Sequence, residues 1–119
     1  KGDSTMWLIT TIGFFSVVQK PSSDVLTVRA RVKKDLDTLR EKYLPNLSTT
    51  ITNTGSDYPY RATVRHVDFA EALSAIAKDI DYGNFKSHVA QAMGLRRAHL
   101  YHKIWRDLKE LDHLEQLST

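Results

Sequence analysis

The chain has 119 residues, of which 17 are Lys or Arg, 14 are Asp or Glu and none is Cys. This length fits one domain with a single hydrophobic core, and the absence of cysteine excludes disulfide bonds, thiolate metal sites and thiol nucleophiles. The formal net charge of +3 permits a polyanionic partner without identifying one. No stretch reaches the roughly 18 apolar residues of a membrane span, so we expect no membrane partner.

The N-terminal region divides into a polar lead and an apolar segment. Residues 1–5 precede a methionine and resemble a vector-derived remnant, which predicts one α+β domain over 6–119, with a core at 6–82 and a helical extension at 83–119. The apolar segment ends in Gln19-Lys20-Pro21 and lacks the cleavage site of a signal peptide. Since cysteines are also absent, we expect a cytoplasmic protein.

Four segments carry the patterns of β-strands. The first is rich in β-branched and aromatic residues and predicts one long strand that is bulged or bent at Gly13. A short polar turn at Pro21 joins it to the second strand as a hairpin. The predicted strands are 7–19, 25–31, 48–53 and 58–65.

Helical periodicity follows the second and fourth strands. Pro45 ends the first helix, and Asp68 with Glu71 three residues later resembles a capping box that begins the second. Glycines at 83 and 94 interrupt the pattern after that. The predicted helices are 32–44, 68–81, 84–93 and 95–114.

The loop at 79–84 carries two aspartates at the end of a helix, where they oppose the helix dipole. We expect either ion pairs with the basic last helix or a cap on the next helix from Asn84. The loop lacks the closing Glu of a calcium-binding loop, so we expect no metal there.

The order of elements is ββαββα followed by further helices. It predicts a circularly permuted ferredoxin-like fold, a two-layer α+β sandwich with sheet order 1-2-4-3 and both long helices on one face. The second and fourth strands are then central. Their alternation directs apolar side chains toward the helices and arginines to the opposite face. These arginines are Arg29, Arg31, Arg61 and Arg65.

Three interpretations of this arginine-bearing face stay open. The arginines could pair with acids on the C-terminal helices or on a second subunit, or form a binding face for phosphate groups. A slip of one residue in strand parity would instead reverse the faces. RNA-recognition motifs use aromatic rings on the central strands, and here only the first strand can supply rings, as Trp7 with Phe15 or as Phe14 alone.

The last helix is basic in its first half. Its side chains could contact phosphate, meet an acidic partner or be solvated. His99 and His102 have a spacing that would hold a metal only with a third ligand, and we expect none. The basic side chains are Arg96, Arg97, Lys103, Arg106 and Lys109.

No phosphate-cradling glycine loop, nucleophile elbow or Ser/His/Asp signature is present. Some ferredoxin-like RNA-processing proteins activate a 2′-hydroxyl with histidine. His66, near Tyr60 or Arg65, and His102 are therefore the candidates for a metal-independent ribonuclease.

Four segments of the chain carry a family resemblance. They are 6–20, 26–31, 79–86 and 98–102. Together they resemble a family of small bacterial proteins usually labelled hypothetical. The resemblance implies a bacterial cytosolic origin and carries over no activity.

The leading hypothesis is a non-enzymatic binding module without a cofactor. It would engage single-stranded nucleic acid or another phosphate-bearing ligand. One alternative is a homodimer or protein–protein interaction module, and a second is the His-dependent ribonuclease. The ligand-binding residues predicted by the leading hypothesis are Arg29, Arg31, Arg61, Arg65, Arg96, Arg97 and Lys103.

Overall fold

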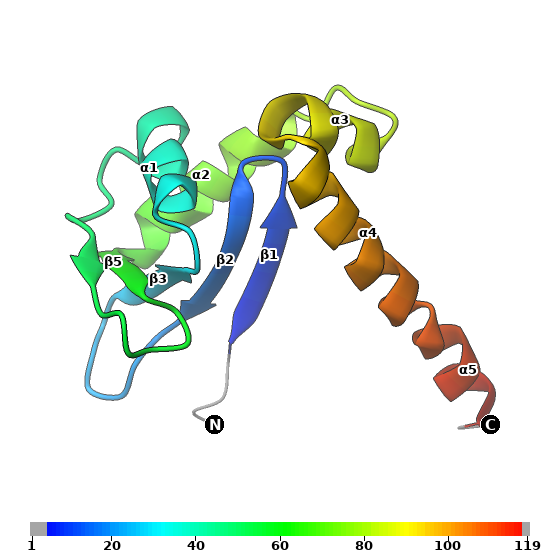
Figure 1. Cartoon of the computed structure of the whole chain (residues 1–119). Helices are drawn as coiled ribbons and strands as arrows, with labels where there is room; N and C mark the ends of the chain where they lie inside the picture. The colour runs from blue at the N-terminus through cyan, green and yellow to red at the C-terminus, as the bar shows by residue number, and fades with distance from the viewer. Residues whose placement is uncertain (1–4, 118–119) are drawn as a thin grey trace. The chain divides into compact units, whose positions relative to one another are not determined.

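The computed structural model describes residues 5–117, so the remnant expected at 1–5 lies outside the described residues apart from Thr5. The chain divides into two compact units, with the boundary between Asp81 and Tyr82. The first unit contains a β-sheet and two helices, and the second contains three helices (Figure 1). The mixed α+β class expected from the sequence is confirmed.

The first unit is built on a five-stranded antiparallel sheet in the order β1-β2-β3-β5-β4. This order differs in detail from the predicted order 1-2-4-3, because the first predicted strand is two strands. The fourth strand in chain order is only two residues long. The elements of this unit are β1 (Met6–Thr10), β2 (Gly13–Val18), β3 (Leu26–Ala30), α1 (Lys33–Lys42), β4 (Ile51–Thr52), β5 (Tyr60–Val64) and α2 (His66–Lys78).

A tight turn between β1 and β2 replaces the bulge expected at Gly13. The Thr10 hydroxyl donates a hydrogen bond to the carbonyl oxygen of Gly13 (2.8 Å) and accepts hydrogen bonds from the backbone N–H groups of Ile12 and Gly13 (3.1 Å each). Gly13 has a φ of 152°, which a residue with a side chain rarely adopts. The prediction of one continuous strand over 7–19 was wrong because a side chain satisfies the backbone groups at the reversal.

The core of the first unit lies between the sheet and its two helices. Alternate residues of the central strands are buried in it, including Val28 and Ala62, while α1 contributes Leu36 and α2 contributes Phe69. The buried residues of β3 and β5 pair across the strands in register. The predicted helix-facing side of these strands is therefore confirmed, and a one-residue slip in parity is excluded.

The second helix begins two residues before the predicted capping box. Its first residue is His66, and no side chain caps it. The carboxylate of Asp68 accepts hydrogen bonds from the guanidinium of Arg65 instead. The capping-box prediction was wrong because a charged partner three residues earlier engages the carboxylate.

The second unit consists of α3 (Phe85–Met93), α4 (Leu95–Leu108) and α5 (Glu110–Leu117). Asn84 caps α3, because its Oδ1 accepts a hydrogen bond from the Ser87 N–H (2.8 Å). The predicted helix cap from Asn84 is therefore confirmed. Phe85 of α3 stacks on Tyr101 of α4 with ring centroids 5.9 Å apart. The predicted last helix over 95–114 is divided into α4 and α5 at Lys109.

Candidate functional site

Two of the predicted arginines lie side by side on the sheet face that points away from the helices. Arg29 of β3 pairs directly with Arg61 of β5, and Ser16 of β2 stands opposite Arg29 on the other side. The Nη2 of Arg29 donates a hydrogen bond to the Ser16 hydroxyl (2.6 Å). Val28, Ala30 and Ala62, which are neighbours of these arginines along the strands, are buried in the core, so this face carries the polar side of both strands.

Tyr58 organises the arginines on this face. The guanidinium carbons of Arg29 and Arg31 lie 4.7 and 4.9 Å from the centre of its ring, within the range of cation–π attraction. Arg61 holds the loop that carries Tyr58, because its Nε donates to the Tyr58 carbonyl oxygen (3.2 Å) and its Nη2 to the Ser56 hydroxyl (2.6 Å). We call Arg29, Arg31 and Arg61 with Tyr58 the arginine cluster.

The arginine cluster has no carboxylate partner within the part of the chain that the structure describes. In the first unit, Lys33, Arg40 and Arg65 are cations that do form ion pairs with carboxylates. Arg29 is half-buried, and its buried Nε makes no hydrogen bond to another described residue. Like charges on neighbouring strands repel one another, so a bound anion would stabilise this arrangement.

Aromatic rings extend the same face onto β1 and β2. Trp7 pairs with Ser16 in the sheet, and its ring meets Phe14 edge-on at a centroid distance of 5.4 Å. Phe14 in turn lies 6.3 Å from Tyr58. The Trp7 side chain is 63% exposed, whereas Phe15 is buried in the core. Trp7 and Phe14 thus share this face, so the prediction of Trp7 with Phe15 and the prediction of Phe14 alone were both wrong. Both assumed one continuous strand, whereas the turn at 11–12 reverses the chain between the two rings.

Arg65 does not belong to the arginine cluster. It follows the last residue of β5 and forms two hydrogen bonds with the Asp68 carboxylate, at 3.1 and 3.3 Å. Hydrogen bonding to Arg65 lowers the pKa of Asp68, and donating to that carboxylate raises the pKa of Arg65. The i,i+3 spacing of these two charges is a signal that could have predicted their pairing from the sequence.

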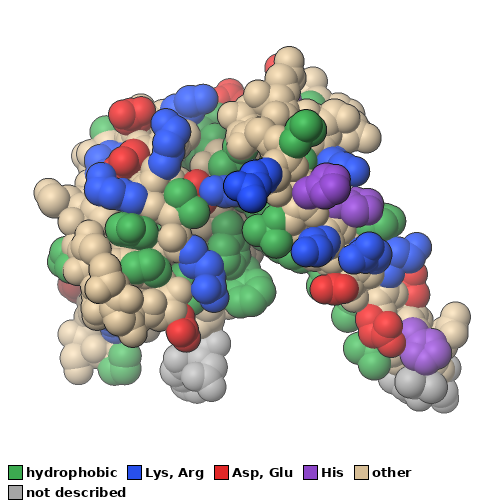
Figure 2. All heavy atoms as spheres, in the orientation of Figure 1, with side chains coloured by type: hydrophobic (Ala, Val, Ile, Leu, Met, Phe, Trp, Pro, Cys, Tyr) green, Lys and Arg blue, Asp and Glu red, His purple; other side chains and the backbone are tan. Residues whose placement is uncertain are grey.

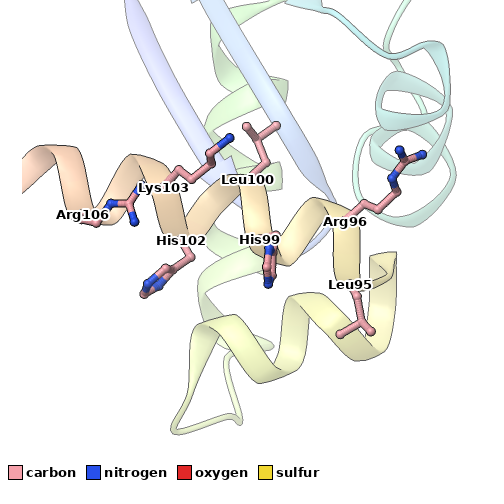
Figure 3. Close-up of a pocket in the computed structure, with 7 residues that line it drawn as sticks. All are labelled: Leu95, Arg96, His99, Leu100, His102, Lys103 and Arg106. Atoms are coloured by element: carbon pink, nitrogen blue, oxygen red, sulfur yellow. The ribbon is translucent and has the colours of Figure 1, made fainter.

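In the second unit, one side of α4 forms a basic surface around a depression of about 520 Å³ (Figure 3). The side chain of Arg97 does not line this depression but contacts Tyr101. Its Nη1 donates a hydrogen bond to the Tyr101 hydroxyl (3.2 Å), and its guanidinium lies 5.8 Å from the centre of that ring. The residues that line the depression are Leu95, Arg96, His99, Leu100, His102, Lys103 and Arg106.

The two histidines considered for catalysis lie in different units. His66 is exposed at the start of α2, while Tyr60 packs against the core of the first unit. His102 stacks on Trp105 with ring centroids 5.4 Å apart. The described residues include no group of three or more His, Cys, Asp or Glu side chains that could hold a metal ion.

The chain has no match among models of protein families, curated proteins or solved structures. Among the described helices, none combines the length and the apolar character needed to cross a membrane.

Sequence reasoning missed Tyr58 and Ser16 as members of the site. Tyr58 was expected within a strand, but β5 begins at Tyr60 and Tyr58 lies in the preceding loop. Hydrogen bonds with Ser56 and Arg61 hold Tyr58 there, but its ring contacts Arg29 and Arg31 of a distant segment, so no local pattern could have found its role. Ser16 could have been placed opposite Arg29 only with the hairpin register known.

Proposed function

We propose that this protein is a non-enzymatic module that binds single-stranded nucleic acid on the sheet face away from α1 and α2. Arg29 and Arg31 contact backbone phosphates, and Trp7 stacks on a base. The observation that carries the proposal is that two guanidinium groups share the Tyr58 ring without a carboxylate partner among the described residues. The proposal keeps the permuted ferredoxin-like topology and the cytoplasmic location expected from the sequence.

The chemistry of the cluster supports a phosphate ligand. A guanidinium group is planar and always charged, and its donors match the oxygen atoms of a phosphate. Among the described residues, Arg61 donates from both Nε and Nη2, to Tyr58 and Ser56, whereas Arg29 donates from Nη2 alone, to Ser16. Arg29 and Arg31 therefore keep more donors for a phosphate. Tyr58 is 8% exposed, which makes it a support for the arginines rather than a surface for a base.

The exposed indole of Trp7 supports a single strand rather than a duplex. A ring on an open sheet face can stack on an unpaired base, whereas the bases of a duplex are already stacked on each other. Trp7 lies beside Ser16, the hydrogen-bond partner of Arg29, so a base and its phosphate could be bound by neighbouring parts of one face.

The proposal is tested by fluorescence anisotropy with a labelled oligouridylate at low salt. Trp7→Leu should weaken binding about tenfold, because base stacking on an aromatic side chain contributes about 1–3 kcal/mol. Trp105→Leu is the matched control, since Trp105 is exposed to a similar extent, 57% against 63% for Trp7. Circular dichroism would verify that both variants are folded.

Three results would refute the proposal. They are the absence of binding at low salt, an equal loss in both tryptophan variants, and equal affinity for a duplex of the same length. RNA cleavage that is lost in His66→Ala or His102→Ala would refute its non-enzymatic part.

A further inference from the structure

The last two helices expose an apolar stripe that the described part of the chain leaves uncovered. Leu100, Leu111 and Leu114 are 51%, 56% and 52% exposed, and Ile104 is half-buried. Their spacings of four, seven and three residues place them on one side of a helix. Lys109 between α4 and α5 keeps right-handed helical backbone angles, with φ −61° and ψ −19°, so α5 continues in nearly the direction of α4 (Figure 1).

The charges beside this stripe are segregated along the helices. Figure 2 shows Lys, Arg and His side chains along α4 and Asp and Glu side chains toward α5. Residues 95–109 contain five Lys or Arg and one Asp, whereas residues 110–117 contain three Asp or Glu and no Lys or Arg. In a parallel pair of these helices, like charges would face each other and repel. In an antiparallel pair, the basic half of each helix would face the acidic half of the other.

We propose that two copies of this chain associate antiparallel through α4 and α5. The pairing has two-fold symmetry, with the axis near residue 106. Leu100 of one copy packs against Leu111 of the second copy, and Lys103 faces Glu110 of the second copy.

The apolar and the charged contacts agree on this register. The midpoint between Leu100 and Leu111 and the midpoint between Lys103 and Glu110 differ by about one residue, or about 1.5 Å along a helix. Leu100 and Lys103 also point to the same side of α4 (Figure 3). In a coiled coil, charged side chains that flank the apolar seam set the partner and the orientation of the helices.

This inference goes beyond the proposed function and does not depend on it. The sheet face in the first unit takes no part in the pairing, so loss of nucleic-acid binding would leave the association intact. The charge complementarity within one chain favours a second copy over a different protein, because a single sequence supplies both halves of the interface.

The inference is tested by sedimentation equilibrium of the full chain over a wide range of protein concentration. The native protein should show a monomer–dimer equilibrium. Lys103→Glu and Glu110→Lys should each raise the dimer Kd roughly tenfold, because each reversal places like charges at two symmetric positions. The double variant Lys103→Glu/Glu110→Lys should restore the native Kd. The control is Lys86→Glu, an equal charge reversal at an exposed residue of α3, which should leave the Kd unchanged.

The rescue by the double variant separates this pairing from effects within one helix. Residues 103 and 110 are seven positions apart, so they are not i,i+3 or i,i+4 neighbours on the same helix. Circular dichroism should show equal helix content in all variants. A strict monomer at all concentrations, a dimer indifferent to the single reversals, or a double variant without rescue would each overturn the inference.

Discussion

The salt dependence of nucleic-acid binding reports how many phosphates the protein neutralises. For a single strand, the logarithm of the affinity falls with the logarithm of the salt concentration with a slope of about −0.7 per phosphate. The proposal assigns phosphate contacts to two members of the arginine cluster, Arg29 and Arg31, because both Nε and Nη2 of Arg61 already donate to Tyr58 and Ser56. The expected contribution of the cluster to the slope is therefore about −1.4.

Replacing exposed Arg31 by glutamine should remove one of these contacts. The slope should become less negative by about 0.7. When the salt concentration rises fourfold, the loss of affinity that comes from the cluster's phosphate contacts should be about threefold in the variant and about sevenfold in the native protein. Anisotropy titrations of an oligouridylate at several salt concentrations provide the measurement.

Lys34→Gln provides the control for this prediction, because Lys34 is an exposed cation on α1 and should leave the slope unchanged. An Arg31→Gln variant whose affinity falls without a change of slope would refute the reasoning. So would a native slope near zero, since phosphate contacts would then not contribute to binding.

Two further predictions concern the first unit. Gly13→Ala should destabilise the protein by about 1–3 kcal/mol in urea unfolding, because the added Cβ would lie 2.6 Å from the Cβ and Cγ of Asp35. Gly83→Ala, where the added atom meets nothing within 4 Å, is its control, and an equal loss in both would contradict the steric argument. Arg65→Gln should raise the pKa of Asp68 toward its ordinary value in an NMR titration. Because that pKa is lowered in the folded protein, the pair stabilises the fold above the ordinary carboxyl pKa, and the stabilisation is lost as the pH falls through the lowered value. An Asp68 pKa unchanged in Arg65→Gln would contradict this assignment.

The sequence predicted the elements of the sheet better than the reversals between them. Alternation along 25–31 correctly placed Val28 in the core, since period-two patterning needs only local information. The hairpin after Thr10 was missed because both local hydrogen bonds of Thr10 and a contact with a distant residue hold the reversal. The Phe14 N–H donates a hydrogen bond to Asp35 Oδ2 (3.0 Å), a buried carboxylate 21 positions along the chain. No local pattern reports such a contact.

In the candidate site too, the sequence predicted positions within regular strands but not positions in loops. Strand parity was enough to place Arg29 and Arg61 on one face, because both lie within regular strands. Arg65 lies beyond the end of its strand, where parity no longer determines the direction of a side chain. Tyr58 lies in a loop and its ring contacts Arg29 and Arg31, which are distant in the sequence, so its role as a support for the arginines could be found only from the structure.

The most direct test of the proposed binding face is an NMR titration of the isotopically labelled protein with a short single-stranded oligonucleotide. The account predicts that the indole N–H of Trp7 and the side-chain Nε–H of Arg31 shift together and saturate at one ligand concentration. Shifts confined to Arg96 and Lys103 on α4, or no shift at Trp7 and Arg31 at low salt, would contradict it.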